Sequence, residues 1–487
     1  MQPRTRITIQ NNALGILPPQ FGSLVALTGY ASGGTPNQPY TFGTVKSLEG
    51  ALIDGPLVEA AAHVIERYGN PVVCIPTAAS TAAVVGAPVF DGSGTSVPAA
   101  AADVPGPVND LEIFIAVVDS EGTNTIGTDD ITVQYSLDNG RNMSGNILLP
   151  ATGIFPVPGS GVTVTFAAGT LLVGDTTYVK VDAPQWSGTE LADAVEALSL
   201  SKVNWDILEI VGELVPTNVV TLETKFAGLA AAGKFRMYVG SAALPDVGET
   251  DAAYQATLQA AWANTATVYG SITAGATLMV SSLTGQIFLR PVSYVFAPWL
   301  AHLSEEQDAA ALIYGPLPCT VYDDNGNLVD RCHDETIYPG LDDMRFTVLR
   351  SWTSYAGTYV NNPRMMSPEG SDFKYCQARR VINIAAAVLQ RYFDLRLSVA
   401  VAVDSKTGKI LEEEAKEMES GAVAAMAAAL TAKPKASAVS CVVSRDDNIL
   451  STELINVTAR VTPLGYPKAI EIDLAFDNPA ANTALAS

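Results

Sequence analysis

The sequence predicts a mainly parallel α/β domain that is interrupted by an all-β insertion and followed by an α+β C-terminal region. Three observations indicate this organisation. Amphipathic helical segments alternate with short apolar runs over residues 20–87 and again over 188–355, whereas residues 88–187 show no helical period. Beyond residue 356, two long helical patterns precede a group of short strands. A chain of 487 residues is also too long for a single compact core.

The first half of the α/β domain is predicted over residues 20–87. Phe21–Thr28 has the composition of a buried strand, and apolar side chains recur at helical spacing from Leu52 to Ile65. Asn70-Pro71 ends this predicted helix, because the residue before a proline is biased away from helical geometry. Val72–Ile75 is then a short, continuously apolar run, which is typical of a strand covered on both faces.

Residues 88–187 form the predicted insertion. Their short alternating runs have the period of two that half-buried strands show, and Gly-rich turn signals such as Asp138-Asn139-Gly140 separate them. This pattern favours a sandwich-like domain. The predicted strands are 111–118, 131–137, 162–166 and 177–181.

The second half of the α/β domain, residues 188–355, repeats the alternation of helix and strand. Helices are predicted at 191–198, 217–232 and 250–266, and strands at 205–211, 235–239 and 276–282. A hairpin is predicted at 317–331, around Asn325-Gly326. The two halves would flank the insertion and share one sheet.

Residues 356–467 form the predicted C-terminal domain. Apolar residues at helical spacing predict one helix over 381–392 and a second over 410–430. Lys433-Pro434-Lys435 stops the second helix, because a proline cannot continue it. Strands are then predicted at 438–443, 454–461 and 470–476.

The two ends of the chain, residues 1–19 and 468–487, are predicted to be strand-forming arms. Ile470, Ile472, Leu474 and Phe476 alternate with Glu471, Asp473 and Ala475, and Ile7 and Ile9 alternate in the same way near the start. An arm of this kind can join a sheet of a neighbouring subunit, which supplies main-chain hydrogen bonds between subunits. The alternative is that the last strand closes the sheet of its own subunit.

Charge and composition exclude several functions. The formal net charge is −22 and no basic stripe occurs, so we expect no nucleic-acid binding. Only 16% of residues are charged, which fits a surface largely covered by partners. The five cysteines are scattered, which favours reduced thiols, and the first residues lack an apolar signal-peptide core. We therefore expect synthesis in the cytosol and no membrane insertion.

The sequence predicts no catalytic, cofactor or metal site, and hence no enzyme. The histidines, His63, His302 and His333, are far apart, and Cys332-His333-Asp334 is a single local cluster without a second ligand pair at zinc spacing. The glycines from Gly29 to Gly34 follow a strand, but no Lys-Ser/Thr pair of a phosphate loop follows them.

Two regions of the chain, together about half of it, resemble the contractile tail sheath proteins of bacteriophages and related contractile injection systems. The first contains Asn37-Gln38-Pro39-Tyr40, the run 55–60 and the run 70–76. The second, about 345–477, has a strand ending in Arg350, then Asn361-Asn362-Pro363, the helix with Arg379-Arg380, a second helix and terminal strands.

The resemblance implies a subunit that polymerises as stacked six-fold rings around a tail tube and contracts to drive the tube through a target envelope. It implies an inner domain from the C-terminal region, an outer β domain and arms that link subunits. The implied partners are other copies of the chain, the tail tube protein, the baseplate and the tail terminator. The implied location is the contractile tail of a virion, assembled in the host cytoplasm.

For the tube contact, we expect a charged helix carrying Lys406, Lys409 and Lys416, because charged contacts form and part more readily than an apolar seam. A solvated helix face is the alternative. Two other functions also fit the sequence: a capsid, tube or surface-layer subunit, which particle shape would separate, and a carbohydrate-binding protein or hydrolase that uses residues 88–187.

Overall fold

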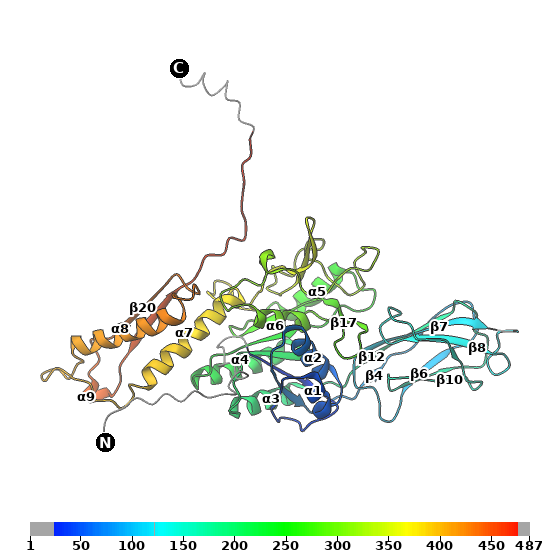
Figure 1. The fold of residues 1–487 in the computed structure, drawn as a ribbon, viewed down its shortest axis with the longest axis horizontal. Coiled ribbons are helices and arrows are strands. Elements are labelled where there is room, and N and C mark those ends of the chain that lie inside the picture. Colours follow the sequence, from blue (N-terminus) through cyan, green and yellow to red (C-terminus); the bar gives the residue numbers. More distant parts are fainter. Residues whose placement is uncertain (1–23, 121, 476–487) are drawn as a thin grey trace, which may run out of the picture.

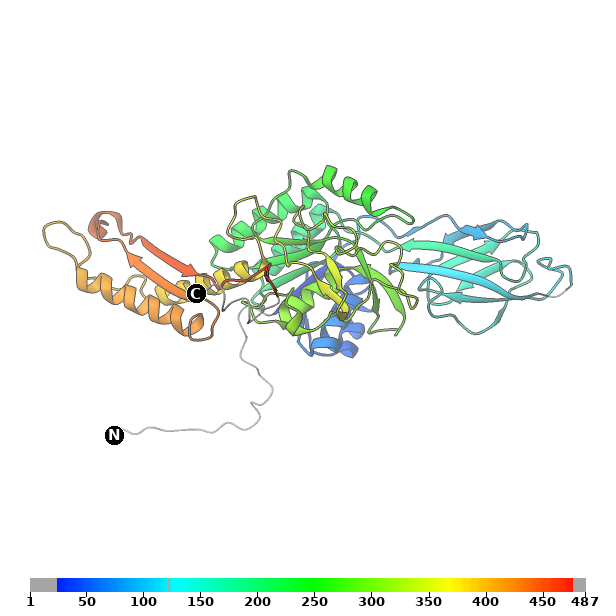
Figure 2. The same ribbon diagram turned by 90° about the horizontal axis from the view of Figure 1, so that it is seen from above.

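The computed structural model describes residues 24–120 and 122–475, and this part of the chain forms three lobes in a row (Figures 1 and 2). The α/β body lies in the centre. The β lobe, residues 84–182, extends from one end of it, and the C-terminal lobe, residues 376–462, from the other. Residues 463–475, here called the C-terminal segment, first contact the body and then run away from it.

A six-stranded sheet organises the body. Its strand order is β15-β14-β13-β1-β3-β2, and every neighbouring pair is parallel except β2 with β3. Because β1 pairs with β13, the two sequence halves on either side of the β lobe form one sheet, as predicted. The strands are β1 (Val25–Tyr30), β2 (Tyr40–Phe42), β3 (Val72–Thr77), β13 (Ile207–Glu213), β14 (Met237–Ser241) and β15 (Gly270–Thr273).

Helices cover both faces of this sheet, because successive strand residues point to opposite sides. Ile207 and Val211 pack toward one group of helices, and Leu208 and Ile210 toward the other. The first group is α1 (Val45–Leu52), α2 (Pro56–Tyr68) and α6 (Ser293–His302); the second is α3 (Gly188–Leu200), α4 (Pro216–Ala231) and α5 (Asp251–Trp262).

The single helix predicted over 52–65 is wrong, because the chain breaks between α1 and α2. Ile53 has φ 63° and Gly55 has φ 126°, values outside the helical region. Gly55 tolerates this backbone because it has no Cβ, and Pro56 then begins α2 at a position where its missing N–H costs nothing. The spacing of apolar residues alone does not reveal a break between two consecutive helices.

The remaining elements of the body are short. They are the hairpin β16 (Ala276–Val280) and β17 (Ile287–Pro291), the 3₁₀ turn η1 (Leu312–Tyr314), and the hairpin β18 (Leu349–Trp352) and β19 (Tyr355–Val360). The predicted boundary at 355/356 is therefore wrong: it cuts through β19, which pairs with β18, and the C-terminal lobe begins only at Cys376. The prediction also omitted β15 and α6.

The hairpin predicted at 317–331 is present but shorter than expected: across its turn, the Val329 N–H donates to the Val321 oxygen and the Asp323 N–H to the Asn327 oxygen, both at 2.9 Å. Its ends pair elsewhere, Leu317 with Thr358 and Thr320 with Leu278. Only the bridge between Tyr322 and Leu328 remains around the Asn-Gly turn. The Asp323 carboxylate accepts hydrogen bonds from the backbone N–H groups of Asn325 and Asn327, so the turn is closed without flanking strands.

The described residues of the β lobe contain strands and no helix. One sheet has the order β4-β12-β7-β8-β9, with β5 also on β12, and the other has the order β10-β11-β6. Alternate side chains of β7, such as Ile113 and Ile115, are buried in a core shared with Val162 and Val164 of β11. The strands are β4 (Val84–Val85), β5 (Val89–Asp91), β6 (Pro98–Ala102), β7 (Leu111–Ser120), β8 (Ile131–Ser136), β9 (Ile147–Leu148), β10 (Ile154–Val157), β11 (Val162–Phe166) and β12 (Thr176–Asp182).

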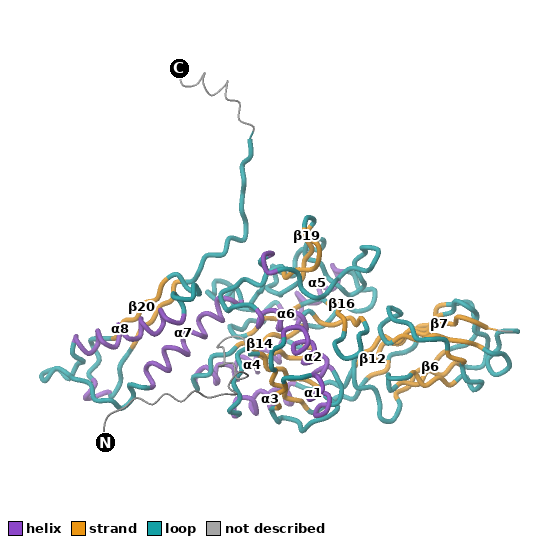
Figure 3. The backbone as a smooth tube through the Cα atoms, viewed as in Figure 1, coloured by secondary structure: helices purple, strands orange, loops and turns teal. Residues whose placement is uncertain are grey.

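The C-terminal lobe consists of two long helices and a two-stranded sheet (Figure 3). Ala422 and Met426 of one helix pack on Cys441 of the sheet. None of the helices in residues 24–475 is long and apolar enough to cross a membrane. The elements of the lobe are α7 (Cys376–Asp394), α8 (Glu412–Ala429), β20 (Ala438–Val443), α9 (Ile449–Thr452) and β21 (Val457–Thr462).

Candidate functional site

The C-terminal segment exposes the apolar residues predicted for the arm. The side chains of Ile470, Ile472 and Leu474 are 75%, 79% and 93% exposed, and residues 463–475 form neither helix nor strand. Ile7, Ile9 and Phe476 lie outside the described residues. Because burying such side chains is favourable, an apolar row left in solvent fits a surface that another molecule covers.

The sheet of the C-terminal lobe has two open edges in the described part of the chain. β20 pairs with β21 and with no other strand, and α8 covers one face of the pair. The strand predicted at 470–476 is not formed in its described part, since residues 470–475 are neither strand nor helix, and these residues do not join the sheet of their own subunit. Pro463 follows directly after β21, and a proline cannot donate to a ladder.

The charged helix predicted to carry three lysines is corrected in part. Lys416 lies on α8, but Lys406 and Lys409 lie in the loop before it. The Asp404 carboxylate accepts hydrogen bonds from the backbone N–H groups of Lys406 and Thr407, and Gly408 has φ 67°. These contacts make a turn where a helix was expected.

Carboxylates accompany these lysines. Lys409 pairs with Asp446 at 2.9 Å and Lys416 with Glu412 at 3.2 Å, and all four side chains are well exposed. Such pairs contribute little stability, because solvent screens them. The lysines therefore lie on a solvated surface of mixed charge, where another protein could also contact them.

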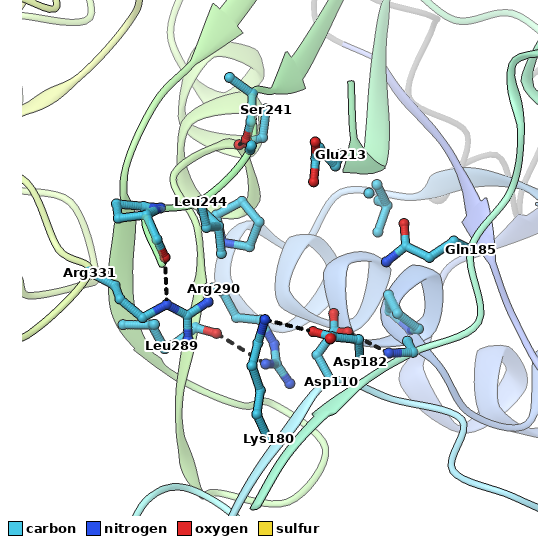
Figure 4. A pocket seen from close by; sticks show the side chains of 18 of the residues that line it. Asp110, Lys180, Asp182, Gln185, Glu213, Ser241, Leu244, Leu289, Arg290 and Arg331 are labelled. Carbon is cyan, nitrogen blue, oxygen red and sulfur yellow. Dashed lines mark hydrogen bonds and ion pairs between the residues drawn. The ribbon is translucent and has the colours of Figure 1, made fainter. Parts of the chain in front are cut away.

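A cleft of about 340 Å³ lies where the β lobe joins the body (Figure 4). The carboxyl ends of β1, β13 and β14 open into it, so the cleft occupies the position in an open α/β sheet where small molecules often bind. Lys180 and Asp182 of β12 form an ion pair at 3.1 Å, and Asp110 accepts a hydrogen bond from the Ala183 N–H at 2.7 Å. Burial raises the pKa of Asp110.

Ion pairs and hydrogen bonds around this cleft join the β lobe to the α/β body. Glu112 of β7 accepts a hydrogen bond from Arg331 of the body at 3.0 Å and contacts Arg141 of its own lobe at 3.5 Å. The Asp138 carboxylate accepts from the Ile287 N–H at 3.0 Å, and Phe288 of β17 is buried in the core of the β lobe. Polar and apolar contacts therefore both connect the β lobe to the body, and we interpret the cleft as part of a rigid joint between them.

A further ion pair, between Arg290 and Glu59, is fully buried beneath the cleft. The Arg290 guanidinium of β17 donates to one carboxylate oxygen of Glu59 on α2, from Nε at 3.0 Å and from a terminal nitrogen at 2.7 Å. Burial disfavours the charged guanidinium, but the adjacent Glu59 carboxylate raises the pKa of Arg290 overall. The pair ties α2, the hairpin β16–β17 and the entry to the β lobe, because Asn109 also contacts Glu59 at 3.3 Å.

The side chains of His333 and His63 are buried within the fold, and that of Cys319 is half-buried. His333 lies between Asp251 at 2.8 Å and Glu335 at 2.9 Å. Burial disfavours its charged form, but these hydrogen bonds raise the pKa of His333 overall. Burial lowers the pKa of His63 to about 4 and raises the pKa of Cys319 to about 12. Within the described residues, no group of three or more His, Cys, Asp or Glu could hold a metal ion.

Sequence reasoning missed the residues of this joint. Glu112 and Arg331 are 219 positions apart, and Glu59 and Arg290 are 231 positions apart, so no local pattern connects them. One signal in the sequence pointed to Glu112: charged residues are scarce in this chain, and Glu112 alternates with the apolar residues of a strand. The turn at Asp138 was found, but its contact with Ile287 was not.

The comparisons with known proteins concern the C-terminal region and the fold. A family model described as DUF2586, C-terminal domain, matches residues 372–481, and no curated protein matches the chain in sequence. A chain of the anti-feeding prophage (AFP) helical sheath in its contracted state aligns over 98% of this chain and 99% of its own, with 9% identity and a TM-score of 0.51.

Two further solved structures were matched. A sheath tail protein from Listeria innocua aligns over 92% of this chain and 96% of its own, with 12% identity and a TM-score of 0.45. A chain of the AFP baseplate aligns over 98% and 100%, with 8% identity and a TM-score of 0.49. The likeness to the AFP sheath chain shows that this protein has the fold of a tail sheath protein; at that identity it shows the fold alone.

Proposed function

We propose that this chain is the structural subunit of a contractile tail sheath. It polymerises as stacked hexameric rings around a tail tube and contracts to drive the tube through a target cell envelope. The fold of the AFP helical sheath chain supports this proposal. The observation that carries it is local: an exposed apolar row on the C-terminal segment occurs in the same chain as a two-stranded sheet with two open edges.

The segment and the sheet are complementary in chemistry. The open edges of β20 and β21 offer backbone N–H and C=O groups to an added strand. The C-terminal segment of a neighbouring copy supplies such a strand, with Ile470, Ile472 and Leu474 on one face. Burying three such side chains contributes roughly 5–9 kcal/mol before the cost of ordering the segment and of losing subunit freedom. The N-terminal arm with Ile7 and Ile9 would join in the same way.

The three lobes suggest how the subunit sits in a sheath. The C-terminal lobe, which carries the open sheet, lies on the inner side toward the tube, and the β lobe lies outside. The contacts at Glu112 and Glu59 let the body and β lobe move as one unit while the arms hinge, which is the rigid-body motion that contraction needs. The tube protein, baseplate and terminator are the proposed partners, in the contractile tail of a virion.

The tube contact remains a proposal. Lys416 on α8, with Lys406 and Lys409 in the adjacent loop, is the proposed tube-facing group, because its charges are solvated and can change partners. No catalytic step is assigned to the chain: the proposed work is mechanical, and its energy is stored in the packing between subunits.

Deletion of residues 468–487 tests the proposed function. We expect the truncated subunit to stay folded and to melt only slightly below the full chain, because the contacts that the described part of the deleted segment makes with its own subunit are those of Lys468 with Asp308 and Tyr375, but to form no polymers in electron micrographs. Deletion of residues 478–487 is the matched control and should leave long hollow cylinders. Closed shells or flat arrays from the full chain would favour a capsid or surface-layer subunit, and normal cylinders from the 468–487 deletion would contradict the proposed arm.

A further inference from the structure

Residues 303–308, which directly follow α6, are one of the places where the C-terminal lobe meets the body. The Arg380 guanidinium of α7 donates to the backbone oxygens of Leu303 at 2.9 Å and Ser304 at 3.2 Å. Lys435, which follows α8, forms an ion pair with Glu305. Both contacts place a cation of the C-terminal lobe on this short stretch of the body.

The root of the C-terminal segment is held at the same place. The Tyr466 hydroxyl donates to the backbone oxygen of Glu306 at 2.5 Å, and burial raises the pKa of Tyr466 to about 12. The Lys468 ammonium lies 2.5 Å from the Asp308 carboxylate and 4.6 Å from the centre of the Tyr375 ring. The side chain of Asp308 is 10% exposed, so this ion pair is partly shielded from solvent.

The contacts between the C-terminal segment and the body end at Lys468. The Lys468 side chain is 32% exposed and contacts Asp308, whereas Ile470 is 75% exposed as a whole residue and has no hydrogen bond or ion pair among the described residues. No ion pair or hydrogen bond between the segment and the body occurs beyond Lys468 in the described residues. The lysine therefore marks the position where the segment leaves its own subunit.

We infer that Lys468, held by Asp308 and Tyr375, is the positioning residue that fixes where the arm departs from its subunit. This inference rests on the proposed function, since it concerns the donation of that arm. Holding the chain at Lys468 shortens the tether between the body and the arm, which raises the effective concentration of the arm at the neighbouring sheet and lowers the entropy lost on docking. Force applied to the docked arm is also transmitted through Lys468 to residues 303–308, so the strand β21 carries less of it.

The contact between residues 303–308 and the C-terminal part of the chain joins carboxylates on one side to cations on the other. Residues 303–308 carry Glu305, Glu306 and Asp308, and the groups that reach them include Arg380, Lys435 and Lys468. The chain has 28 Lys and Arg against 50 Asp and Glu, so cations are scarce. A charge-assisted hydrogen bond that is shielded from solvent holds its geometry better than an exposed pair.

The test replaces Lys468 in the full chain and measures the arm and the assembly separately. Lys468→Met keeps the aliphatic stem and removes the ammonium, Lys468→Arg keeps the charge, and Lys433→Met removes an exposed lysine nearby as the matched control. Nitroxide labels at Ile470→Cys and Val220→Cys, both exposed sites, report the spread of distances between arm and body in the unassembled subunit. A Cys319→Ser background avoids the half-buried native thiol.

We expect Lys468→Met to broaden the distance distribution and to raise the protein concentration needed for half-maximal polymer formation about tenfold, as the loss of one charge-assisted hydrogen bond predicts. Lys468→Arg and Lys433→Met should match the wild type in both measurements. Tyr466→Phe, which removes only a hydroxyl, should broaden the distribution less. If Lys468→Met lowers the melting temperature, Tyr466→Phe serves as a milder second variant of the same anchor.

Unchanged distances and unchanged assembly of Lys468→Met would overturn the anchor and leave the proposed function intact, provided that deletion of 468–487 still abolishes polymers. Assembly of that deletion would instead overturn the proposed function. A broadened distribution with normal assembly would also overturn the positioning role, because the arm would then dock equally well from a loose root.

Discussion

Replacing Glu59 with alanine tests how strongly the buried joint holds the body together. Glu59 and Arg290 are 1% and 3% exposed, and two guanidinium nitrogens donate to the same carboxylate oxygen. The substitution leaves the Arg290 charge buried without its partner, which costs about 3–5 kcal/mol. It also removes the acceptor of the Asn109 side chain. We therefore expect a large fall in the stability of the body.

The assay is urea unfolding at 25 °C, followed by the fluorescence of the tryptophans. The matched control is Glu196→Ala, which removes an exposed pair with Lys225 and should cost about 0–1 kcal/mol. The double variant Glu59→Met with Arg290→Met should recover much of the loss, because the other oxygen of Glu59 is buried without a hydrogen-bond partner in the described residues. A loss for Glu59→Ala no larger than that of the control would refute the reasoning.

Three further predictions concern the joint, the pH response and the β lobe. Glu112→Gln should loosen the contact with Arg331, so amide exchange should rise at the strand containing Ile287 while the C-terminal lobe is unchanged; equal exchange would contradict the joint. Because the pKa of His333 is raised on folding, its ion pairs stabilise the protein fully below about pH 6.5, and this contribution is lost as the pH rises through the folded value. The melting temperature of His333→Gln should therefore differ from wild type more at pH 5.5 than at pH 9. Replacing the β lobe, residues 84–182, with a Gly/Ser linker should preserve assembly if Phe288, which the deletion would expose, is changed to Ser, and this range keeps Trp186 in the core of the body; loss of all polymers would contradict an outer position of the lobe.

Periodicity identified most of the body, because secondary structure depends on which face of a short segment is apolar. The strand at 72–75 and the helices near 217–232 and 250–266 follow from patterns within a few residues. The break at Gly55 escaped this reasoning, because it depends on backbone torsions and on Pro56 at the first turn of α2. The strand predicted at 470–476 shows the same limit, since a period of two describes a face and not the strand that pairs with it.

The candidate sites divide in the same way. The alternation at Ile470, Ile472 and Leu474 was visible in the sequence, and the structure adds that these side chains lie in solvent. The anchor at Lys468 and the pairs Glu59–Arg290 and Glu112–Arg331 join residues more than a hundred positions apart. Local pattern determined the apolar faces of this protein. Only the tertiary structure decided which charges meet, because ion pairs require proximity in space and leave no period along the chain.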